Sequence, residues 1–156
     1  MRLEELAMAK RILVPLDQSP VAEVVVPLVA AIARGSGATV RLLQVSPVPR
    51  NRASEEGRVL ASADQEMGRL ETEGLDYLRT VEMQLDGAAD VECVVRFGDP
   101  VAEILQEAEA FGADLIAVTT EGRSAVKRTV LGSVAEEVVR KADAQVMLIR
   151  PGRHGL

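Results

Sequence analysis

Two glycines and a serine between residues 119 and 133 have the types and the spacing to bind a phosphate group. Gly122 and Gly132 lie in the stretch TTEGRSAVKRTVLGS, and Ser133 directly follows the second glycine. Glycines let backbone amides approach a ligand closely, and the N-terminus of a helix, which the pattern predicts at Ser133, favours an anion. The stretch therefore predicts a phosphate-binding loop. A structural alternative stays open, because Ser133 and Glu136 have the spacing of a capping box, in which the serine itself closes the helix amides.

The charges around these glycines do not decide between the two interpretations. Arg123, Lys127 and Arg128 could offset phosphate charge or could form a solvated basic surface, whereas Glu121 would repel a phosphate at close range. The chain has neither the lysine-containing GxxxxGK(S/T) signature nor a GxGxxG after a strand. The one histidine, His154, lies in the tail without a serine or carboxylate partner nearby, which disfavours a hydrolase triad or a histidine metal site.

The amino-acid composition disfavours nucleic acid and membranes as binding partners. The chain has 156 residues and a net charge of −6, so a broad basic surface for nucleic acid or anionic lipid is not expected. Aromatic residues make up only 2% of the chain, which leaves few side chains for base stacking. The single cysteine, Cys93, excludes an internal disulfide and is expected to pack in the core. Without a signal-peptide pattern or a membrane-length apolar run, we expect a cytoplasmic protein with no nucleic-acid or membrane partner.

The apolar runs predict five strands that alternate with helices. Strands are predicted at residues 11–17, 39–45, 91–97, 114–120 and 145–151; helices are predicted at 21–35, 100–112 and 133–142, with a long amphipathic helix after residue 58 that extends to about residue 85. Pro27 falls inside the first helix and should kink or restart it. The strands are almost continuously apolar, so both sheet faces should be covered. We therefore expect an α/β fold with a doubly wound five-stranded parallel sheet, order 3-2-1-4-5, with helices on both faces. We also expect one domain over 1–156, with an N-terminal extension at 1–9 and a flexible loop at 46–58.

The topology predicts where a ligand would bind. In such sheets ligands bind beyond the carboxyl ends of the strands, where the winding direction reverses. In the expected order this point lies between strands one and four, so the loops that begin at Asp17 and Thr119 should meet there. Asp17 could accept a ligand hydroxyl or serve as a turn residue. In the sequence FGDP, Gly98 is predicted to make a bend, Asp99 to cap the next helix, and Pro100 to occupy its first position.

Most of the chain resembles the universal stress protein family. The resemblance is carried by KRILVPLDQSP and LLQV in the amino half, and by the whole stretch from FGDPVAEILQ to QVMLIRP in the carboxyl half. Members that bind ATP carry the pattern G-x-x-G, nine residues, then G-(S/T). Gly122, the nine residues after it and the pair Gly132-Ser133 agree with this pattern, whereas Thr119 replaces the first glycine. The resemblance therefore implies ATP, with or without Mg²⁺, as the ligand.

The resemblance also implies which positions contact the nucleotide. Asp17 is implied to lie near the ribose and adenine, and Val45 to pack on the adenine, while the glycine-rich loop and Ser133 hold the phosphates. The complete set of implied nucleotide-binding residues is Pro15, Leu16, Asp17, Val45, Thr119, Thr120, Gly122, Arg123, Gly132, Ser133 and Val134.

The resemblance implies a regulatory or sensing role in a stress response rather than an enzyme, with a homodimer formed through the strand at 145–150. That strand is apolar and should lie at a sheet edge, where unpaired backbone invites another strand. Relatives commonly carry histidine in place of Glu121, so a second hypothesis is a dimeric interaction protein that has lost nucleotide binding. A phosphotransferase that uses Asp17 is a third hypothesis, disfavoured because LDQSP lacks a second acidic residue two positions on. Slow ATP hydrolysis stays open.

Overall fold

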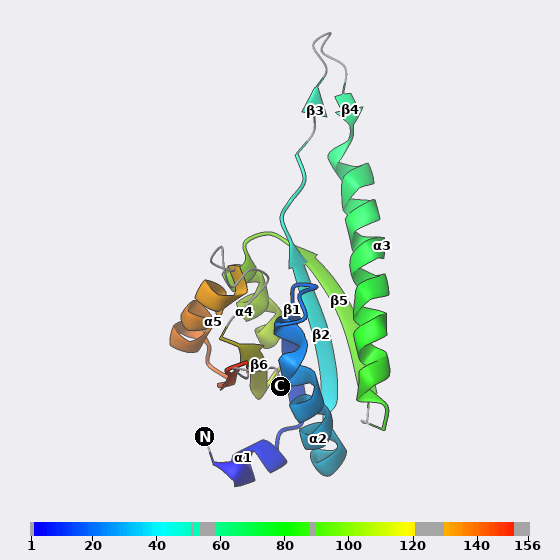
Figure 1. Cartoon of the computed structure of the whole chain (residues 1–156). Helices are drawn as coiled ribbons and strands as arrows, with labels where there is room; N and C mark the ends of the chain where they lie inside the picture. The colour runs from blue at the N-terminus through cyan, green and yellow to red at the C-terminus, as the bar shows by residue number, and fades with distance from the viewer. Residues whose placement is uncertain (1, 51, 54–58, 88–89, 121–129, 152–156) are drawn as a thin grey trace.

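The computed structural model describes residues 2–50, 52–53, 59–87, 90–120 and 130–151. Five short apolar segments form a parallel sheet at its centre (Figure 1). The strands are β1 (Arg11–Leu16), β2 (Thr39–Ser46), β5 (Asp90–Phe97), β6 (Leu115–Thr119) and β7 (Gln145–Ile149). They lie in the order β5-β2-β1-β6-β7, and every neighbouring pair is parallel. Numbered along the chain this is the order 3-2-1-4-5, so the predicted topology is confirmed.

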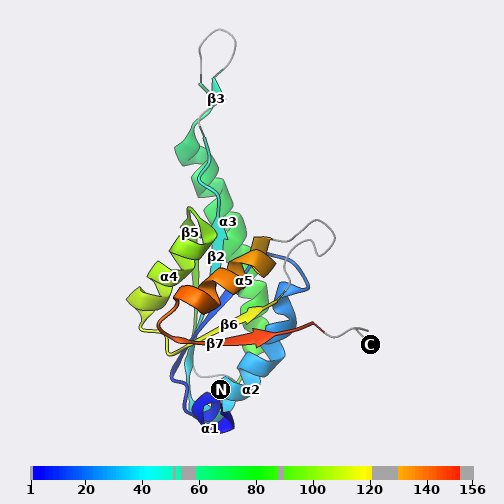
Figure 2. The same cartoon turned by 90° about the vertical axis from the view of Figure 1, so that its left-hand side faces the viewer.

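Helices cover both faces of the sheet, with α4 and α5 on one face and α2 and α3 on the other (Figure 2). The helical elements are α1 (Leu3–Ala7), η1 (Ala22–Val25), α2 (Val26–Ser36), α3 (Ala63–Glu82), η2 (Met83–Leu85), α4 (Pro100–Phe111) and α5 (Val130–Lys141). Pro27 lies in the first turn of α2, directly after the 3₁₀ helix η1, so the predicted restart is confirmed. Among the described helices, none has both the length and the hydropathy needed to cross a membrane.

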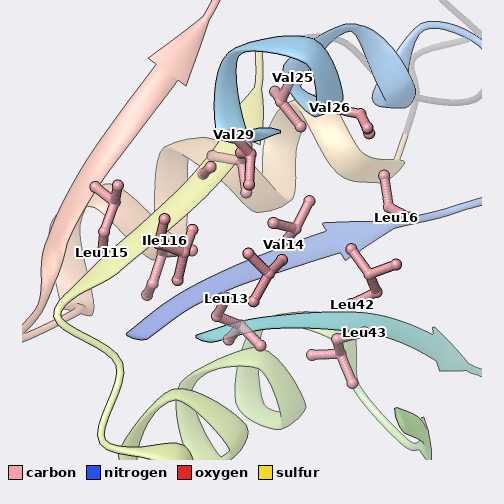
Figure 3. Packing of buried hydrophobic residues seen from close by; sticks show 14 of the residues in the cluster. Leu13, Val14, Leu16, Val25, Val26, Val29, Leu42, Leu43, Leu115 and Ile116 are labelled. Carbon is pink, nitrogen blue, oxygen red and sulfur yellow. The ribbon is translucent and has the colours of Figure 1, made fainter. Parts of the chain in front are cut away.

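The core forms because alternate residues of each strand point to opposite faces of the sheet. Val14 of β1 and Leu42 of β2 are register partners and pack beneath Val29 of α2 (Figure 3). Leu13 and Leu43 point to the other face, which α4 covers. All five side chains are fully buried. The continuous apolar strands are thus explained by burial on both faces, as the sequence analysis expected.

A cluster of charged side chains lies between α4 and the sheet, and we call it the α4 ionic cluster: Arg41, Arg96, Glu103 and Glu107. Glu107 is only 4% exposed. It accepts hydrogen bonds from Arg41 Nη1 at 2.5 Å and from Arg96 Nη1 at 2.8 Å. Arg96 Nε also donates to Glu103 at 2.7 Å, and the Arg41 guanidinium lies 4.1 Å from the centroid of the Phe111 ring. The buried carboxylate is tolerated because both of its oxygens bond to cations.

Two segments differ from the predicted elements. The predicted loop at 46–58 begins with the last residue of β2 and contains β3 (Arg52–Ala53), which pairs antiparallel with β4 (Val59–Ala61). Residues 51 and 54–58 lie outside the described part of the chain. β3, β4 and the first turns of α3 extend beyond the carboxyl ends of the strands (Figure 1). The second difference is α5, which begins at Val130 instead of Ser133.

Candidate functional site

A cavity of about 600 Å³ opens at the carboxyl ends of β1 and β2. Asp17 and Gln18 line it directly after β1, and Val45 and Ser46 line it at the end of β2. The two strand ends are neighbours because every residue of β1 pairs with β2, up to Leu16 opposite Gln44. The cavity therefore lies at the predicted edge of the sheet. Its described lining is on the β2 side of β1, so it lies beside the predicted switch point between β1 and β6.

The opposite wall comes from residues that the sequence analysis did not include in the site. Leu70 and Glu73 line the cavity from α3, and Gly98 and Pro100 line it from the turn between β5 and α4. Leu70 lies within the predicted long helix, and FGDP was predicted only as a turn with a helix cap. The position of α3 above the strand ends arises from tertiary packing, which no local pattern in the sequence indicates.

A smaller hollow of about 50 Å³ shares Asp17 and Val45 with this cavity. It is also lined by Pro15 and Leu16 of β1 and by Val134 of α5. The structure thus brings together five of the residues that the resemblance implied, from three separate elements. α5 approaches β1 here because Val134 and the neighbouring Ala135 are buried in the core.

Asp17 is held by the turn that follows β1. Its Oδ1 accepts hydrogen bonds from the backbone N of Ser19 at 3.1 Å and from Ser19 Oγ at 2.6 Å. Ser19 Oγ in turn accepts one from the backbone N of Ala22 at 3.1 Å. The turn alternative for Asp17 is therefore confirmed. The same side chain also lines the cavity, so the structural role does not exclude contact with a ligand.

Three polar side chains form a hydrogen-bonded chain along the cavity. Gln18 Nε2 donates to Gln44 Oε1 at 3.0 Å, and Gln44 Nε2 donates to Ser46 Oγ at 3.2 Å. Sequence reasoning missed all three. A signal for Gln44 was available, because it is a polar residue in the otherwise apolar run RLLQV, and buried polar groups require partners.

The predicted phosphate-binding residues are placed only in part. Thr119 is fully buried at the end of β6, and the backbone N of Thr120 donates to Ile149 O of β7 at 2.9 Å. Gly132 and Ser133 lie at the start of α5, and none of these four residues lines the 600 Å³ cavity. Glu121, Gly122, Arg123, Lys127 and Arg128 lie outside the described residues.

The capping-box alternative for Ser133 is wrong, because a capping serine precedes the first helical residue. α5 begins at Val130, so Ser133 is its fourth residue. The physical reason is that glycine is tolerated inside a helix at a modest cost, which burial of Val134 and Ala135 in the same helix can offset. The segment before Gly132 therefore joins the helix. Gly132 and Ser133 remain in the first turn of a helix, near the positive end of its dipole.

The prediction for FGDP is confirmed. Gly98 has a φ of +144°, and its N donates to Ser46 O at 2.9 Å. Asp99 caps α4 by accepting from the N of Ala102 at 3.0 Å, and Pro100 is the first residue of the helix. Only glycine adopts such a φ readily. Because Gly98 has no side chain, its backbone itself lines the cavity.

The described groups at the cavity are acidic or neutral. Glu73 accepts from Arg69 Nη1 at 3.0 Å on the exposed side of α3. Behind the Asp17 turn, the Tyr77 hydroxyl donates to Glu23 Oε2 at 2.7 Å. Burial, together with the neighbouring carboxylates of Glu23 and Asp17, raises the pKa of Tyr77 well above its usual value, so Tyr77 remains a proton donor. Within the described ranges, no three acidic, histidine or cysteine side chains lie close enough together to hold a metal ion.

Comparisons with known proteins agree on one family. A sequence model of the Universal stress protein family matches residues 8–150. A putative universal stress protein of Staphylococcus haemolyticus is 42% identical over 65 residues, which are 41% of this chain and only 39% of that protein. The structure of the hypothetical protein MJ0577 matches with a TM-score of 0.78 and 28% identity, covering 94% of this chain and 99% of the other. A universal stress protein in complex with cAMP matches with a TM-score of 0.69 and 24% identity, covering 93% and 99%.

The match to the family model includes every strand of the central sheet and all the described residues that line the cavity. The observed strand order and the structural likeness over nearly the whole length of MJ0577 are in accord with it. The chain therefore belongs to the universal stress protein family.

Proposed function

We propose that the chain binds an adenine nucleotide, ATP, in the 600 Å³ cavity and that it acts as a regulatory or sensing protein in a stress response. The observation that carries the proposal is the lining of the cavity. Val45, Leu70 and Pro100 offer apolar surface on which a purine ring can pack, and Asp17 lies beside them. The proposal is further supported by a protein of similar fold that was solved in complex with cAMP.

Asp17 is proposed to accept hydrogen bonds from the ribose hydroxyls. Its carboxylate is already oriented, because Ser19 donates twice to Oδ1. A group that is ordered before the ligand arrives loses less conformational entropy on binding. A carboxylate is also a stronger acceptor than a neutral oxygen, which suits a pair of hydroxyl donors.

The phosphates are proposed to extend toward α5. The small hollow leads from Asp17 to Val134, and Gly132 and Ser133 lie one to two residues earlier in the same helix. The amino end of a helix favours anions through the helix dipole. Thr120 is proposed to line the approach directly after β6, and Gly122 and Arg123 are proposed to complete the motif. A magnesium ion bound with ATP would be held chiefly by phosphate oxygens, because the described residues offer no carboxylate cluster.

The test is a search for bound nucleotide followed by a titration. Purified protein is denatured and the supernatant is analysed for released nucleotide; dialysed protein is then titrated with ATP, ADP and AMP by calorimetry. We expect binding of ATP. If no nucleotide is released and no heat of binding is found up to millimolar ATP, the ATP-binding proposal is wrong and the second hypothesis, an interaction protein without nucleotide, takes its place.

A pair of isosteric variants tests the role of Asp17. Asp17→Asn keeps an oxygen that can accept from Ser19 but removes the charge, and we expect about a tenfold loss of ATP affinity, the size of a charge-assisted hydrogen bond. Asp76→Asn is the control, because Asp76 is exposed on α3 and does not line the cavity. Equal affinities of the two variants would place the ribose elsewhere.

The homodimer is proposed to form through residues 145–150. β7 is an edge strand of the sheet, so one side of its backbone has no strand neighbour among the described residues, and Leu148 on it is 43% exposed. Leu148→Asp should convert a dimer into a monomer when mass is measured by light scattering after size exclusion. Met83→Asp is the control, because Met83 is equally apolar and 77% exposed but lies in η2, next to α3. A dimer that survives Leu148→Asp would refute this interface.

A further inference from the structure

The turn that carries Asp17 is held from outside by a residue of α3. The Tyr77 hydroxyl donates to Glu23 Oε2 at 2.7 Å, and the backbone N–H of Gln18 points at the same hydroxyl oxygen as a hydrogen-bond donor. Gln18 follows Asp17 directly, whereas Glu23 lies in η1, where the turn ends. A single hydroxyl group therefore joins the beginning of this turn to its end.

The direction of both contacts follows from the groups that make them. An ionised carboxylate can only accept, so the hydroxyl proton lies toward Glu23, and a backbone N–H can only donate, so that of Gln18 meets a lone pair of the Tyr77 oxygen. Burial, together with the carboxylates of Glu23 and Asp17, raises the pKa of Tyr77 well above its usual value. The hydroxyl therefore keeps its proton at neutral pH, and Tyr77 can donate and accept at the same time.

The contact at Gln18 falls on a strained part of the backbone. Gln18 has a φ of +67° and is the one non-glycine residue with a positive φ in the part of the chain that the structure describes. Left-handed backbone costs free energy for a residue with a side chain, and it persists where the surroundings hold it in place. Tyr77 contacts the backbone of this residue and is therefore placed to hold it.

The hydrogen bonds inside the turn are all local. Asp17 Oδ1 accepts from Ser19 Oγ at 2.6 Å, and Ser19 Oγ accepts from the backbone N of Ala22 at 3.1 Å. These bonds shape the turn but do not attach it to α3. Tyr77 supplies a link to that helix, and Glu73, one helical turn earlier, lines the cavity wall opposite Asp17.

We propose that Tyr77 is a positioning residue for the nucleotide: its hydroxyl holds both ends of the turn and thereby keeps the Asp17 carboxylate in the orientation in which it meets the ligand. This inference rests on the proposed function. Asp17 lines the cavity and Tyr77 does not, so the effect of Tyr77 on binding passes through Asp17. A group that is held in place before the ligand arrives loses less conformational entropy on binding. Loss of the hydroxyl should therefore weaken binding although no ligand contact is removed.

The test is a double-mutant cycle on ATP affinity, measured by calorimetry. Tyr77→Phe removes the hydroxyl and keeps the ring, and it should weaken ATP binding about fivefold in the otherwise wild-type protein, the size of one net hydrogen bond. In the Asp17→Asn background the same change should weaken binding less than about twofold, because the charge that Tyr77 positions is already absent. A residue that only shapes the fold would cost the same in both backgrounds.

Two further variants accompany the cycle. Thr80→Val is the control, because it also removes a hydroxyl from α3, but Thr80 is exposed and its Oγ1 donates to the backbone O of Tyr77; ATP affinity should not change. Glu23→Gln keeps an oxygen that can accept from Tyr77 but removes its charge, so it should weaken ATP binding about threefold, and again only while Asp17 is present. It provides the same comparison if Tyr77→Phe does not fold. Urea denaturation of every variant ensures that folded proteins are compared.

Each outcome decides the inference. A loss of affinity that occurs only in proteins that keep Asp17 supports it. An equal loss in both backgrounds, or a loss in Tyr77→Phe no larger than in Thr80→Val, overturns it while ATP binding stands. If Asp17→Asn alone leaves ATP affinity unchanged, the inference falls together with the role proposed for Asp17, and ATP binding again stands. If the wild-type protein binds no ATP, the proposed function and this inference fail together.

Discussion

Two glycines of α3 allow the close packing of this helix to be measured against a matched control. Gly68 and Gly74 both lie inside the helix, where alanine is normally more stable than glycine by about 1 kcal/mol. A Cβ at Gly68 would meet nothing within 4 Å. A Cβ at Gly74 would lie 2.9 Å from Cγ2 of Val95, a stiff side chain on β5, and 3.2 Å from Nε2 of Gln44. The same substitution should therefore have opposite effects at the two positions.

The expected magnitudes follow from these distances. Gly68→Ala should raise the free energy of unfolding by about 0.5–1 kcal/mol. At Gly74 the same helical gain is opposed by overpacking, which costs about 1–3 kcal/mol because Val95 cannot move aside without shifting the strand or its rotamer. Gly74→Ala should thus be up to about 2 kcal/mol less stable than the wild-type protein.

The assay is urea denaturation followed by circular dichroism, with the slope of the transition checked to be equal in all three proteins. The two variants should differ by about 1–3 kcal/mol, or by several degrees in Tm for a chain of this length. Equal stabilisation by both substitutions would refute the close approach of α3 to β2 and β5.

Three further changes test other parts of the structure. Glu107→Gln should lower the free energy of unfolding in urea by about 2 kcal/mol, because Arg41 and Arg96 lose their buried anion. Glu109→Gln is the control: Glu109 is exposed, and the change should alter that free energy by less than about 0.5 kcal/mol. Similar values for the two variants would contradict the α4 ionic cluster. Burial and the nearby carboxylate of Glu82 in α3 raise the pKa of Cys93 to about 11. The protonated thiol therefore stabilises the fold fully below pH 9, and this stabilisation is lost as pH rises through 11. Its alkylation by iodoacetamide, followed by mass spectrometry, should still rise about tenfold from pH 9 to pH 10, and a plateau near pH 9 would refute the shift. Asp99→Ala removes the cap on Ala102 N and should cost about 1 kcal/mol of thermal or urea stability; no loss would mean that the cap is not formed.

The sheet could be predicted because its signals are local and strong. Apolar runs of five to eight residues, separated by helical patterns, predict parallel strands that are covered on both sides, and this order of elements leaves few topologies. The positions of Asp17 and Val45 at the site then follow from the ends of two neighbouring strands. These residues could be placed without any knowledge of how the helices pack.

The rest of the site depends on contacts between distant elements. Leu70 and Glu73 reach the cavity only because α3 lies across the strand ends, and that position is set in part by Gly74. In the sequence, Gly74 only weakens a helical pattern, whereas in the structure it marks a point of close approach to Val95 and Gln44. The start of α5 was misplaced for a related reason: Gly132 was taken as a boundary, but burial of Val134 favours helix on both sides of it.

The α4 ionic cluster has a consequence for the dimensions of the cavity. The hydrophobic effect is non-directional, whereas the forked bonds of guanidinium groups fix the relative position of the groups that they join. Arg41 and Arg96 hold Glu107 from two different strands, and Pro100 lies about two helical turns away at the cavity wall. The distance between that wall and the strand ends is therefore set by charges remote from the opening, and a change at Glu107 would alter the width of a cavity that it does not line.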